Sequence, residues 1–313
     1  MGTIHEYNIN GTLILGVDAG YGNYKTAHCT FQTGLTKSAE PPAFSGDYLE
    51  YDGGYYIFGE GHKDFVAEKQ TDEDNYILTL AAIVKELEKR GVTTARIHLA
   101  VGLPLKWVQA QRESFRMYMI QKPHVELKYR GRRYVVDIAD CTVVPQCYAA
   151  IAENLRAFQG LYMIADIGNG TMNLMILNNG RVSERKSWTV RMGVHQCFMK
   201  IQNSVMDRTG ERLPEEIIEN YLRSGKTEID EKYAVPMREA AKVYVDQIFA
   251  EMRDHDYNPA LMKLYVMGGG ARIVETVGEY DAERVTFDHD IRANAKGYEY
   301  FCYMKLRSQR EGR

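Results

Sequence analysis

The sequence has no apolar run long enough to span a membrane, and its first residues, Met1 to Glu6, lack the basic and apolar regions of a secretory signal. Its five cysteines are odd in number and lack the spacing of paired metal ligands, so we expect neither a disulfide framework nor a zinc site. The formal net charge of −3 provides no general attraction to nucleic acid. These absences favour a cytoplasmic protein with free thiols, no membrane association and no direct binding of nucleic acid.

Several catalytic motifs are absent too. No glycine-rich segment continues into the lysine and hydroxyl residue of a Walker A loop, and the glycines at 268–270 lack the spacing of a Rossmann turn. No Ser-His-Asp arrangement with a nucleophile elbow is found. The acidic patches around His255 and His289 have no second histidine or cysteine at ligand spacing, so we interpret them as helix-end or loop charges.

The chain has 313 residues, 45% of them hydrophobic, which is enough for two globular domains. Its most informative stretch covers residues 161–181. The apolar runs Leu161–Ala165 and Leu174–Leu177 predict two short strands, and Asn179-Gly180 predicts a tight hairpin turn after them.

A glycine turn joins these two strands and consists of Asp166, Ile167, Gly168, Asn169, Gly170 and Thr171. We expect Gly168 and Gly170 to adopt positive φ angles and to leave backbone N–H groups facing an anion. A carboxylate beside such a turn implies a cation, most simply magnesium that carries phosphate.

The same pattern occurs earlier in the chain. Residues 13–25 align without gaps to residues 161–173, which places Asp18 on Asp166, Gly20 on Gly168 and Gly22 on Gly170. One Asp-x-Gly-x-Gly turn is weak evidence, but two copies, each after an apolar strand, indicate a shared function. The alternative is two unrelated hairpins with aspartate-capped turns.

These motifs resemble the two phosphate loops of the actin, Hsp70 and sugar-kinase superfamily. The superfamily's third element, the adenosine motif, is an apolar strand that runs into glycines, and residues 264–271 match it. The resemblance covers nearly the whole chain. It implies an α/β, actin-like (ribonuclease-H-like) fold with nucleotide in the cleft between two domains. Residues 1–157 with a C-terminal helix over 289–313 would form domain I, and residues 158–288 would form domain II.

The resemblance also implies roles for individual residues. Asp18 and Asp166 would hold magnesium through water. Gln146, after Pro145, takes the position of the residue that orients the attacking water, so Gln146 and Asp166 are the catalytic candidates. The second loop usually ends in aspartate, where this chain has Asn173. The implied nucleotide contacts are Asp18, Gly20, Tyr21, Gly22, Asn23, Lys25, Gly168, Asn169, Gly170, Thr171, Gly268, Gly269 and Gly270.

Within the superfamily, the sequence is most similar to bacterial plasmid-segregation actins of the ParM and StbA type. The similarity lies in Gly102-Leu103-Pro104, in the surroundings of Gln146 and in Asn294-Ala295. It implies a filament that hydrolyses ATP (or GTP) and is linked to plasmid DNA by a DNA-binding adaptor protein. A small-molecule kinase, which would need a catalytic base where Gln146 stands, is one alternative. An Hsp70-like or cell-division binding protein is another, although the chain leaves no room for a peptide-binding domain.

The other segments carry helix or strand periodicity. We expect strands over 26–31, 96–101, 125–129 and 134–138, and a hairpin over 49–58 closed by residues 59–62. We expect helices over 76–90, 107–121, 190–207, from 213 onward, 236–255 and 291–306, and one that follows residues 141–150 and ends near 158. Glu216 and Glu219 could contact the nucleoside or form a solvated acidic face. The basic residues 130–133 are interpreted as a solvated turn.

Overall fold

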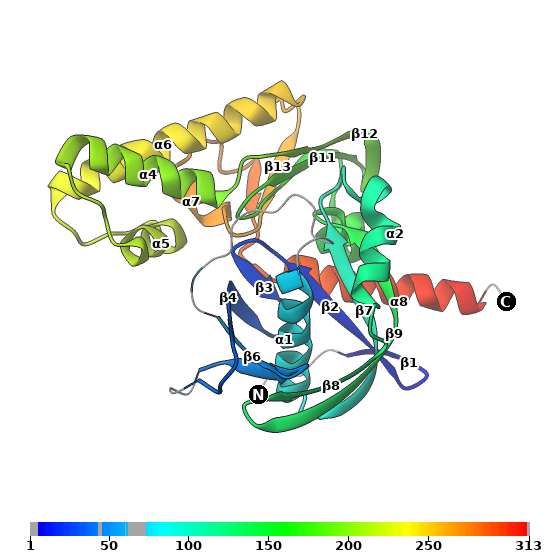
Figure 1. The fold of residues 1–313 in the computed structure, drawn as a ribbon. Helices are drawn as coiled ribbons and strands as arrows, with labels where there is room; N and C mark the ends of the chain where they lie inside the picture. Colours follow the sequence, from blue (N-terminus) through cyan, green and yellow to red (C-terminus); the bar gives the residue numbers. More distant parts are fainter. Residues whose placement is uncertain (1–5, 43–45, 60, 62–72, 312–313) are drawn as a thin grey trace. The chain divides into compact units, whose positions relative to one another are not determined.

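The computed structural model describes residues 6–42, 46–59, 61 and 73–311 (Figure 1). The chain divides into two compact units. Unit 1 comprises Met1–Glu153 with Arg292–Arg313, and unit 2 comprises Asn154–Ile291. The domain boundaries expected from the sequence were 157/158 and 288/289. Each unit is built around a sheet of its own.

The sheet of unit 1 has nine strands, and its centre is parallel. Strand β2 pairs in parallel with β7, and β7 pairs in parallel with β9. Long apolar strands suit this position because helices cover both faces of the sheet. The strands are β1 (Tyr7–Ile9), β2 (Thr12–Ala19), β3 (Asn23–Lys25), β4 (Thr30–Ser38), β5 (Tyr48–Tyr51), β6 (Gly54–Gly59), β7 (Thr94–Leu103), β8 (His124–Tyr129) and β9 (Arg132–Pro145).

Two-residue turns connect several neighbouring strands. In Asp52-Gly53, Arg130-Gly131 and Asn179-Gly180 both residues have positive φ, as type I′ hairpin turns require. This confirms the hairpins expected over 49–58 and after Leu177. Of the basic segment 130–133, only Arg130 and Gly131 form the turn itself. The basic residues there lie beside acids, with Arg130 paired to Asp47 at 2.5 Å, in keeping with a solvated turn.

Alternate residues of the central strands in unit 1 face opposite layers of helix. Leu13, Leu15 and Val17 of β2 join one apolar cluster with helices α1 (Glu73–Lys89) and α2 (Val108–Met119). Ile14 joins a second cluster with α3 (Tyr148–Ile151) and α8 (Ala293–Glu311). Because side chains alternate along a strand, Asp18 lies on the same face as Ile14 and Gly16, the face of α8.

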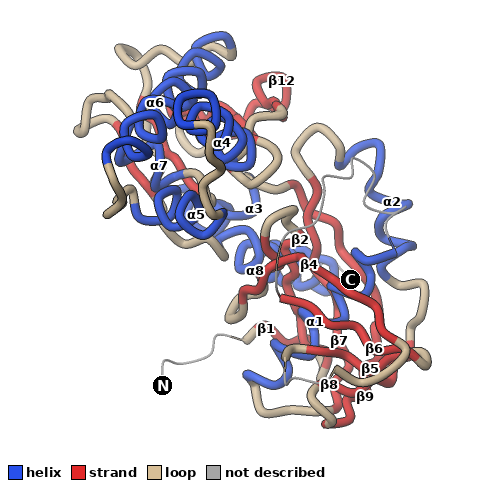
Figure 2. Tube along the Cα trace, turned by 60° about the vertical axis from the view of Figure 1, so that its left-hand side comes forward, coloured by secondary structure: helices blue, strands red, loops and turns tan. Residues whose placement is uncertain are grey.

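Unit 2 has five strands in the order β12-β11-β10-β13-β14, which is 3-2-1-4-5 in chain order. As in unit 1, a central strand has an antiparallel neighbour on one side and parallel strands on the other. Helices α4 to α7 gather over this sheet (Figure 2) and share one apolar cluster with it. The elements are β10 (Leu161–Ile167), β11 (Met172–Asn178), β12 (Arg181–Val190), α4 (Val194–Thr209), α5 (Glu215–Ser224), α6 (Glu231–Asp254), β13 (Lys263–Met267), α7 (Ala271–Val277) and β14 (Val285–Phe287).

Three helix expectations need correction. Helix α6 begins at Glu231 and contains Pro236, because Asp230 caps it and accepts a hydrogen bond from the Lys232 N–H at 2.8 Å. Helix α4 begins at Val194, because Val190 still belongs to β12 and pairs with Met172. The segment after Gln146 forms only the short α3 and a 3₁₀ helix over Ala152–Ala157.

Two strand expectations were also wrong. The strand that returns antiparallel to β2 after the first loop is β3, Asn23–Lys25. The expected return strand at 26–31 instead begins with a turn in which the Thr26 N–H donates to the Cys29 carbonyl. Strand β9 does not stop at Ile138 but runs to Pro145, because it stays paired with β7 as far as Leu103. Residues 60 and 62 of the expected hairpin closure lie outside the described residues.

Within the described ranges, no helix combines the length and apolar character that crossing a bilayer requires. All five cysteines are free, as expected. Their thiols are spread through both units: Cys29, Cys141, Cys147 and Cys302 in unit 1 and Cys197 in unit 2.

Candidate functional site

The ends of three parallel strands in unit 1 bring candidate residues together. In register, Val17 of β2 lies beside Val101 of β7, which lies beside Val143 of β9. Asp18 and Gly102 come directly after Val17 and Val101, and Gln146 follows Pro145, the last residue of β9. Carboxyl ends of parallel strands are the usual place for ligands in α/β sheets. The sequence candidates Asp18 and Gln146 therefore share one edge of the sheet.

Asp18 is the centre of this group and is only 3% exposed. Its Oδ2 accepts a hydrogen bond from Lys25 Nζ at 3.1 Å. Its Oδ1 accepts from Gln146 Nε2 at 3.2 Å and from the Tyr298 hydroxyl at 3.3 Å. Lys25 is in reach because it lies directly opposite Asp18 in the β2–β3 pair. The structure thus joins three residues expected from the sequence and adds one, Tyr298, that the motifs did not reveal.

Gly20 is needed in the first loop because the loop leaves no room for a side chain at that position. The Gly20 N–H donates to the Asp18 carbonyl at 3.0 Å, within the turn. A side chain at Gly20 would place its Cβ 2.6 Å from the Asn23 carbonyl oxygen. The carbonyl of Tyr21 accepts from the Thr33 hydroxyl at 2.7 Å, which anchors the loop to β4.

Asp166 occupies the equivalent position in unit 2 and is 4% exposed. It lies opposite Asn173 in the β10–β11 pair, just as Asp18 lies opposite Lys25. The two loops are therefore equivalent in register as well as in sequence. The Asn173 side chain is 2% exposed, and its Oδ1 accepts a hydrogen bond from Thr189 at 2.8 Å.

The second loop corrects one expectation. Neither Gly168 nor Gly170 has a positive φ, and the Gly168 N–H donates to the Thr171 carbonyl at 2.9 Å rather than facing an anion. The carbonyls of Gly168 and Asn169 accept the N–H groups of Val194 and His195, both at 3.0 Å. The first turn of α4 thereby fixes the shape of this loop.

The third motif lies directly beside Asp166. Gly268 has φ +84°, and a Cβ there would lie 2.6 Å from Asp166 Oδ1. Glycine is therefore required for conformation and for space. The Gly270 N–H donates to the Ile167 carbonyl at 2.9 Å, which ties the motif to β10, whereas Gly269 is exposed with open space around it. The structure thus brings Asp166 and residues 268–270 together, as expected.

Comparisons with known proteins agree with this geometry. A family model described as the N-terminal domain of actin-like proteins matches residues 16–148. A second, the C-terminal domain of archaeal MreB-like actin homologues, matches residues 164–278. The chain belongs to the actin-like superfamily. No curated protein sequence matches it.

Solved structures confirm the actin-like two-domain α/β fold. A 15-stranded ParM filament from Clostridium botulinum shares 16% identity with this actin-like chain over 93% of it and 99% of the relative, with a TM-score of 0.73. An archaeal actin homologue is 16% identical over 93% of this chain and 99% of its own, with a TM-score of 0.72. The complex of that homologue with ADP also matches. Bacillus thuringiensis ParM with ATP is 11% identical over 95% of this chain and 100% of its own, with a TM-score of 0.67.

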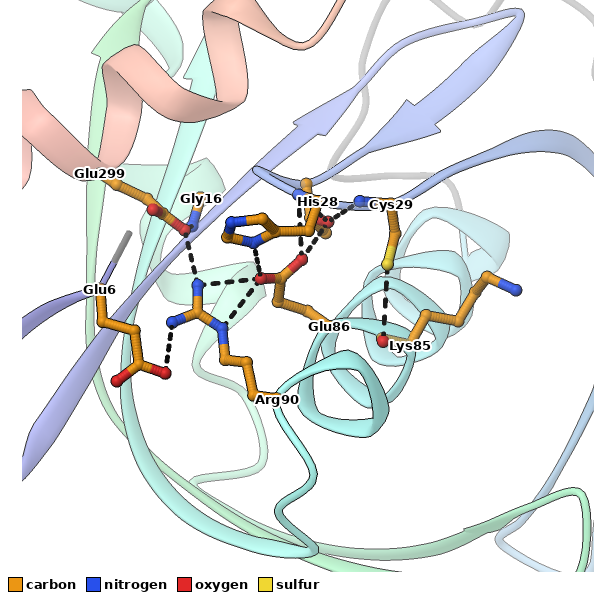
Figure 3. A network of polar contacts seen from close by, with 9 residues as sticks. Glu6, Gly16, His28, Cys29, Lys85, Glu86, Arg90 and Glu299 are labelled. Atoms are coloured by element: carbon orange, nitrogen blue, oxygen red, sulfur yellow. Dashed lines mark hydrogen bonds and ion pairs between the residues drawn. The ribbon is translucent and has the colours of Figure 1, made fainter. Parts of the chain in front are cut away.

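A buried polar network lies behind the first loop of the actin-like chain (Figure 3). Glu86 of α1 accepts from Thr26 Oγ1 and lies within hydrogen-bonding distance of His28 Nδ1, both at 2.5 Å, and it pairs with Arg90 at 2.9 Å. Burial opposes the charge of Glu86, but the hydrogen bonds and Arg90 outweigh it and lower the pKa of this carboxyl. The network fixes the turn that follows Lys25. It was not expected from the sequence, because its members lie far apart in the chain.

Glu299 of α8 belongs to the same network but behaves oppositely. Burial raises its pKa to about 8, although the Gly16 N–H and Arg90 act against this rise. Arg90 Nη2 lies 3.7 Å from Glu299, too far for a hydrogen bond, and its nearer partner is Glu86. Glu86 is thus the charged partner of Arg90, and Glu299 holds a proton near neutral pH.

Each unit by itself offers one buried carboxylate, Asp18 in unit 1 and Asp166 in unit 2. Carboxylates such as Asp18 and Asp166 suit magnesium, which keeps much of its hydration shell. Across the described ranges, no group of three or more His, Cys, Asp or Glu side chains could enclose an ion by itself. Glu216, one of the two possible nucleoside contacts, is exposed, and Glu219 is half-buried.

Proposed function

We propose that this chain is an actin-like ATPase that binds ATP with magnesium, hydrolyses it and assembles into filaments that segregate plasmid DNA. Unit 1 would be actin domain I and unit 2 domain II. The observation that carries the proposal is the duplicated strand-turn-strand, in which Asp18 and Asp166 hold the same register position. A buried carboxylate recurs at the same register position in both copies, which favours a shared ligand over two unrelated turns.

Each residue would have a distinct role. Asp18 and Asp166 would hold magnesium through water, and the ion when bound would neutralise phosphate charge. Lys25 would add a positive charge beside the phosphates. Gly20 and Gly168 use their N–H groups within the turns and would shape the loops. The other loop residues, Tyr21, Gly22, Asn23, Asn169, Gly170 and Thr171, would contact the phosphates. Gly268, Gly269 and Gly270 would border the nucleoside.

Gln146 would orient the attacking water. Its Nε2 donates to Asp18, so its Oε1 is the atom that would accept a hydrogen bond from that water. Its backbone is held because its N–H donates to the Leu103 carbonyl at 2.9 Å. A glutamine cannot act as the general base that a sugar hydroxyl requires, so the kinase reading has less support.

Filament formation is supported by the relatives. The matched Clostridium botulinum ParM is itself a 15-stranded filament. A filament repeats a heterologous contact that does not close. We further propose that the chain acts in the cytoplasm, with itself and a DNA-binding adaptor as partners and without contacting DNA directly.

Phosphate release and sedimentation with ATP and magnesium test this proposal. The wild-type chain should release phosphate and pellet only above a threshold protein concentration. Asp166→Asn should lose phosphate release, since the isosteric amide cannot balance the charge of magnesium. Asp207→Asn, which changes an exposed carboxylate of α4 in the same unit, is the matched control and should behave as wild type. A chain that hydrolyses ATP but stays monomeric at every concentration would favour the kinase or Hsp70-like alternative.

A further inference from the structure

Three side chains from the first two turns of α8 reach the candidate site in unit 1. Asn294 Oδ1 accepts the N–H of Cys147 at 2.9 Å. The Tyr298 hydroxyl donates to Asp18 Oδ1 at 3.3 Å. Glu299 Oε1 accepts the N–H of Gly16, two residues before Asp18, at 3.0 Å (Figure 3). One helix therefore contacts both strand ends that carry Asp18 and Gln146.

Three glycines let the helix come this close. A Cβ at Gly16 would overlap the Ala295 carbonyl oxygen, and a Cβ at Gly297 would overlap that of Ala149. A Cβ at Gly102 would overlap the Tyr298 ring, so the phenol passes over β7 only because Gly102 has no side chain. The Tyr298 ring is fully buried.

The contact with Cys147 holds an unusual backbone conformation. Cys147 has φ +66°, which is rare for a residue with a Cβ, and it directly follows Gln146. Asn294 fixes this conformation by accepting the Cys147 N–H. Since the N–H of Gln146 is bonded to Leu103 and its carbonyl accepts from Tyr148 at 2.7 Å, the backbone around Gln146 is fixed on both sides.

We infer that the first two turns of α8 position the hydrolytic groups: Tyr298 orients the Asp18 carboxylate, and Asn294 fixes the turn that aims Gln146. This inference rests on the proposed function. Tyr298 and Gln146 donate to the same oxygen, Asp18 Oδ1. A shift of that oxygen therefore moves the Gln146 amide as well. Tyr298 and Asn294 act through Asp18 and Gln146, and are positioning residues.

Tyr298→Phe removes the hydroxyl and keeps the ring against Gly102. Tyr300→Phe is the matched control, because it removes a hydroxyl from another tyrosine of the same helix. The Tyr300 ring packs against the Tyr7 ring, with 6.4 Å between the ring centroids. We expect Tyr298→Phe to lower kcat about ten- to a hundred-fold, since small misplacements of reacting groups have effects of this size. The affinity for ATP measured without magnesium should change less than about two-fold, because the lost contact is to Asp18 and not to the nucleotide.

Variants of Asn294 provide a second, independent test of the inference. Asn294→Ala removes the acceptor for the Cys147 N–H, whereas Asn294→Asp keeps an oxygen at that place. Turnover should fall in the alanine variant and return in the aspartate variant. A role in folding alone would instead change the melting temperature of the variants and leave kcat per folded molecule unchanged.

The outcomes separate this inference from the proposed function. Wild-type protein that neither binds nor hydrolyses ATP would overturn both. An active wild type whose Tyr298→Phe variant matches Tyr300→Phe in kcat, and whose Asn294→Ala variant matches Asn294→Asp, would overturn the positioning role alone. A fall in kcat for Tyr298→Phe and Asn294→Ala, with rescue by Asn294→Asp, would support it.

Discussion

Replacing Gln146 by alanine distinguishes a catalytic side chain from a structural one. Gln146 is 9% exposed and donates to the carboxylate of Asp18 at 3.2 Å. A hydrogen bond to a charged group contributes about 1.5–3 kcal/mol, so Gln146→Ala should lower the free energy of unfolding by about that much on either interpretation. From the sequence, a residue that merely starts a helix would have contributed less than about 1 kcal/mol. Stability therefore cannot decide the matter.

Turnover can decide it. If Gln146 orients the attacking water, its main effect is in the transition state, and Gln146→Ala should slow hydrolysis by roughly ten- to a thousand-fold, or about 1.4–4 kcal/mol. Nucleotide affinity without magnesium should stay within about two-fold of wild type. Filaments should then persist longer.

The assay is phosphate release at saturating ATP, paired with a binding titration. Gln121→Ala is the control, because it removes an exposed glutamine from the same unit and should change neither quantity. Normal turnover with normal binding in Gln146→Ala would refute the assignment of Gln146 as the residue that orients the water.

Three further predictions follow from particular contacts. Gly268→Ala should weaken nucleotide binding and lower the free energy of unfolding by about 1–3 kcal/mol. Gly269→Ala should do neither, because the space around Gly269 is open. Equal melting temperatures of the two variants would contradict this. Burial raises the pKa of Glu299 to about 8, so the protonated carboxyl contributes stability that is fully present below its ordinary pKa of 4.5 and is lost as pH rises through 8. Wild-type melting temperature should therefore fall between pH 7 and 9 more than that of Glu299→Gln, which keeps an acceptor for Gly16 and leaves Arg90, Glu86 and Glu6 in place; parallel curves would exclude a titrating Glu299. Assembly with ATP should show a critical concentration in light scattering, and a linear rise from zero protein would argue against a filament.

The two loops and the third motif could be predicted because their signals are local. A strand, an aspartate and spaced glycines are readable within a dozen residues, and the duplicated register of Asp18 and Asp166 follows from the gapless alignment. The reason for the glycines was harder to predict. Gly20 is required because a Cβ there would come too close to the Asn23 carbonyl, and Gly168 forms a hydrogen bond within the turn; neither has a positive φ. A sequence does not show which neighbour comes close.

Long-range contacts could not be predicted. Tyr298 and Asp18 are 280 residues apart in the sequence. In the polar network, Glu299 is 283 residues from Gly16, and Glu86 is 60 residues from Thr26. The extent of β9 was also missed, because pairing with β7 rather than local preference carries the strand past Ile138 to Pro145. Pro236 suggested a helix start, but the cap at Asp230 sets it earlier.

Calorimetric titration of the chain with ATP and magnesium tests the central claim, that both loops serve one nucleotide. The account predicts one nucleotide bound per chain, and a severe loss of magnesium-dependent affinity in Asp18→Asn and in Asp166→Asn alike, with Asp207→Asn unchanged. Unaltered affinity in either loop variant, or two independent nucleotides per chain, would contradict it.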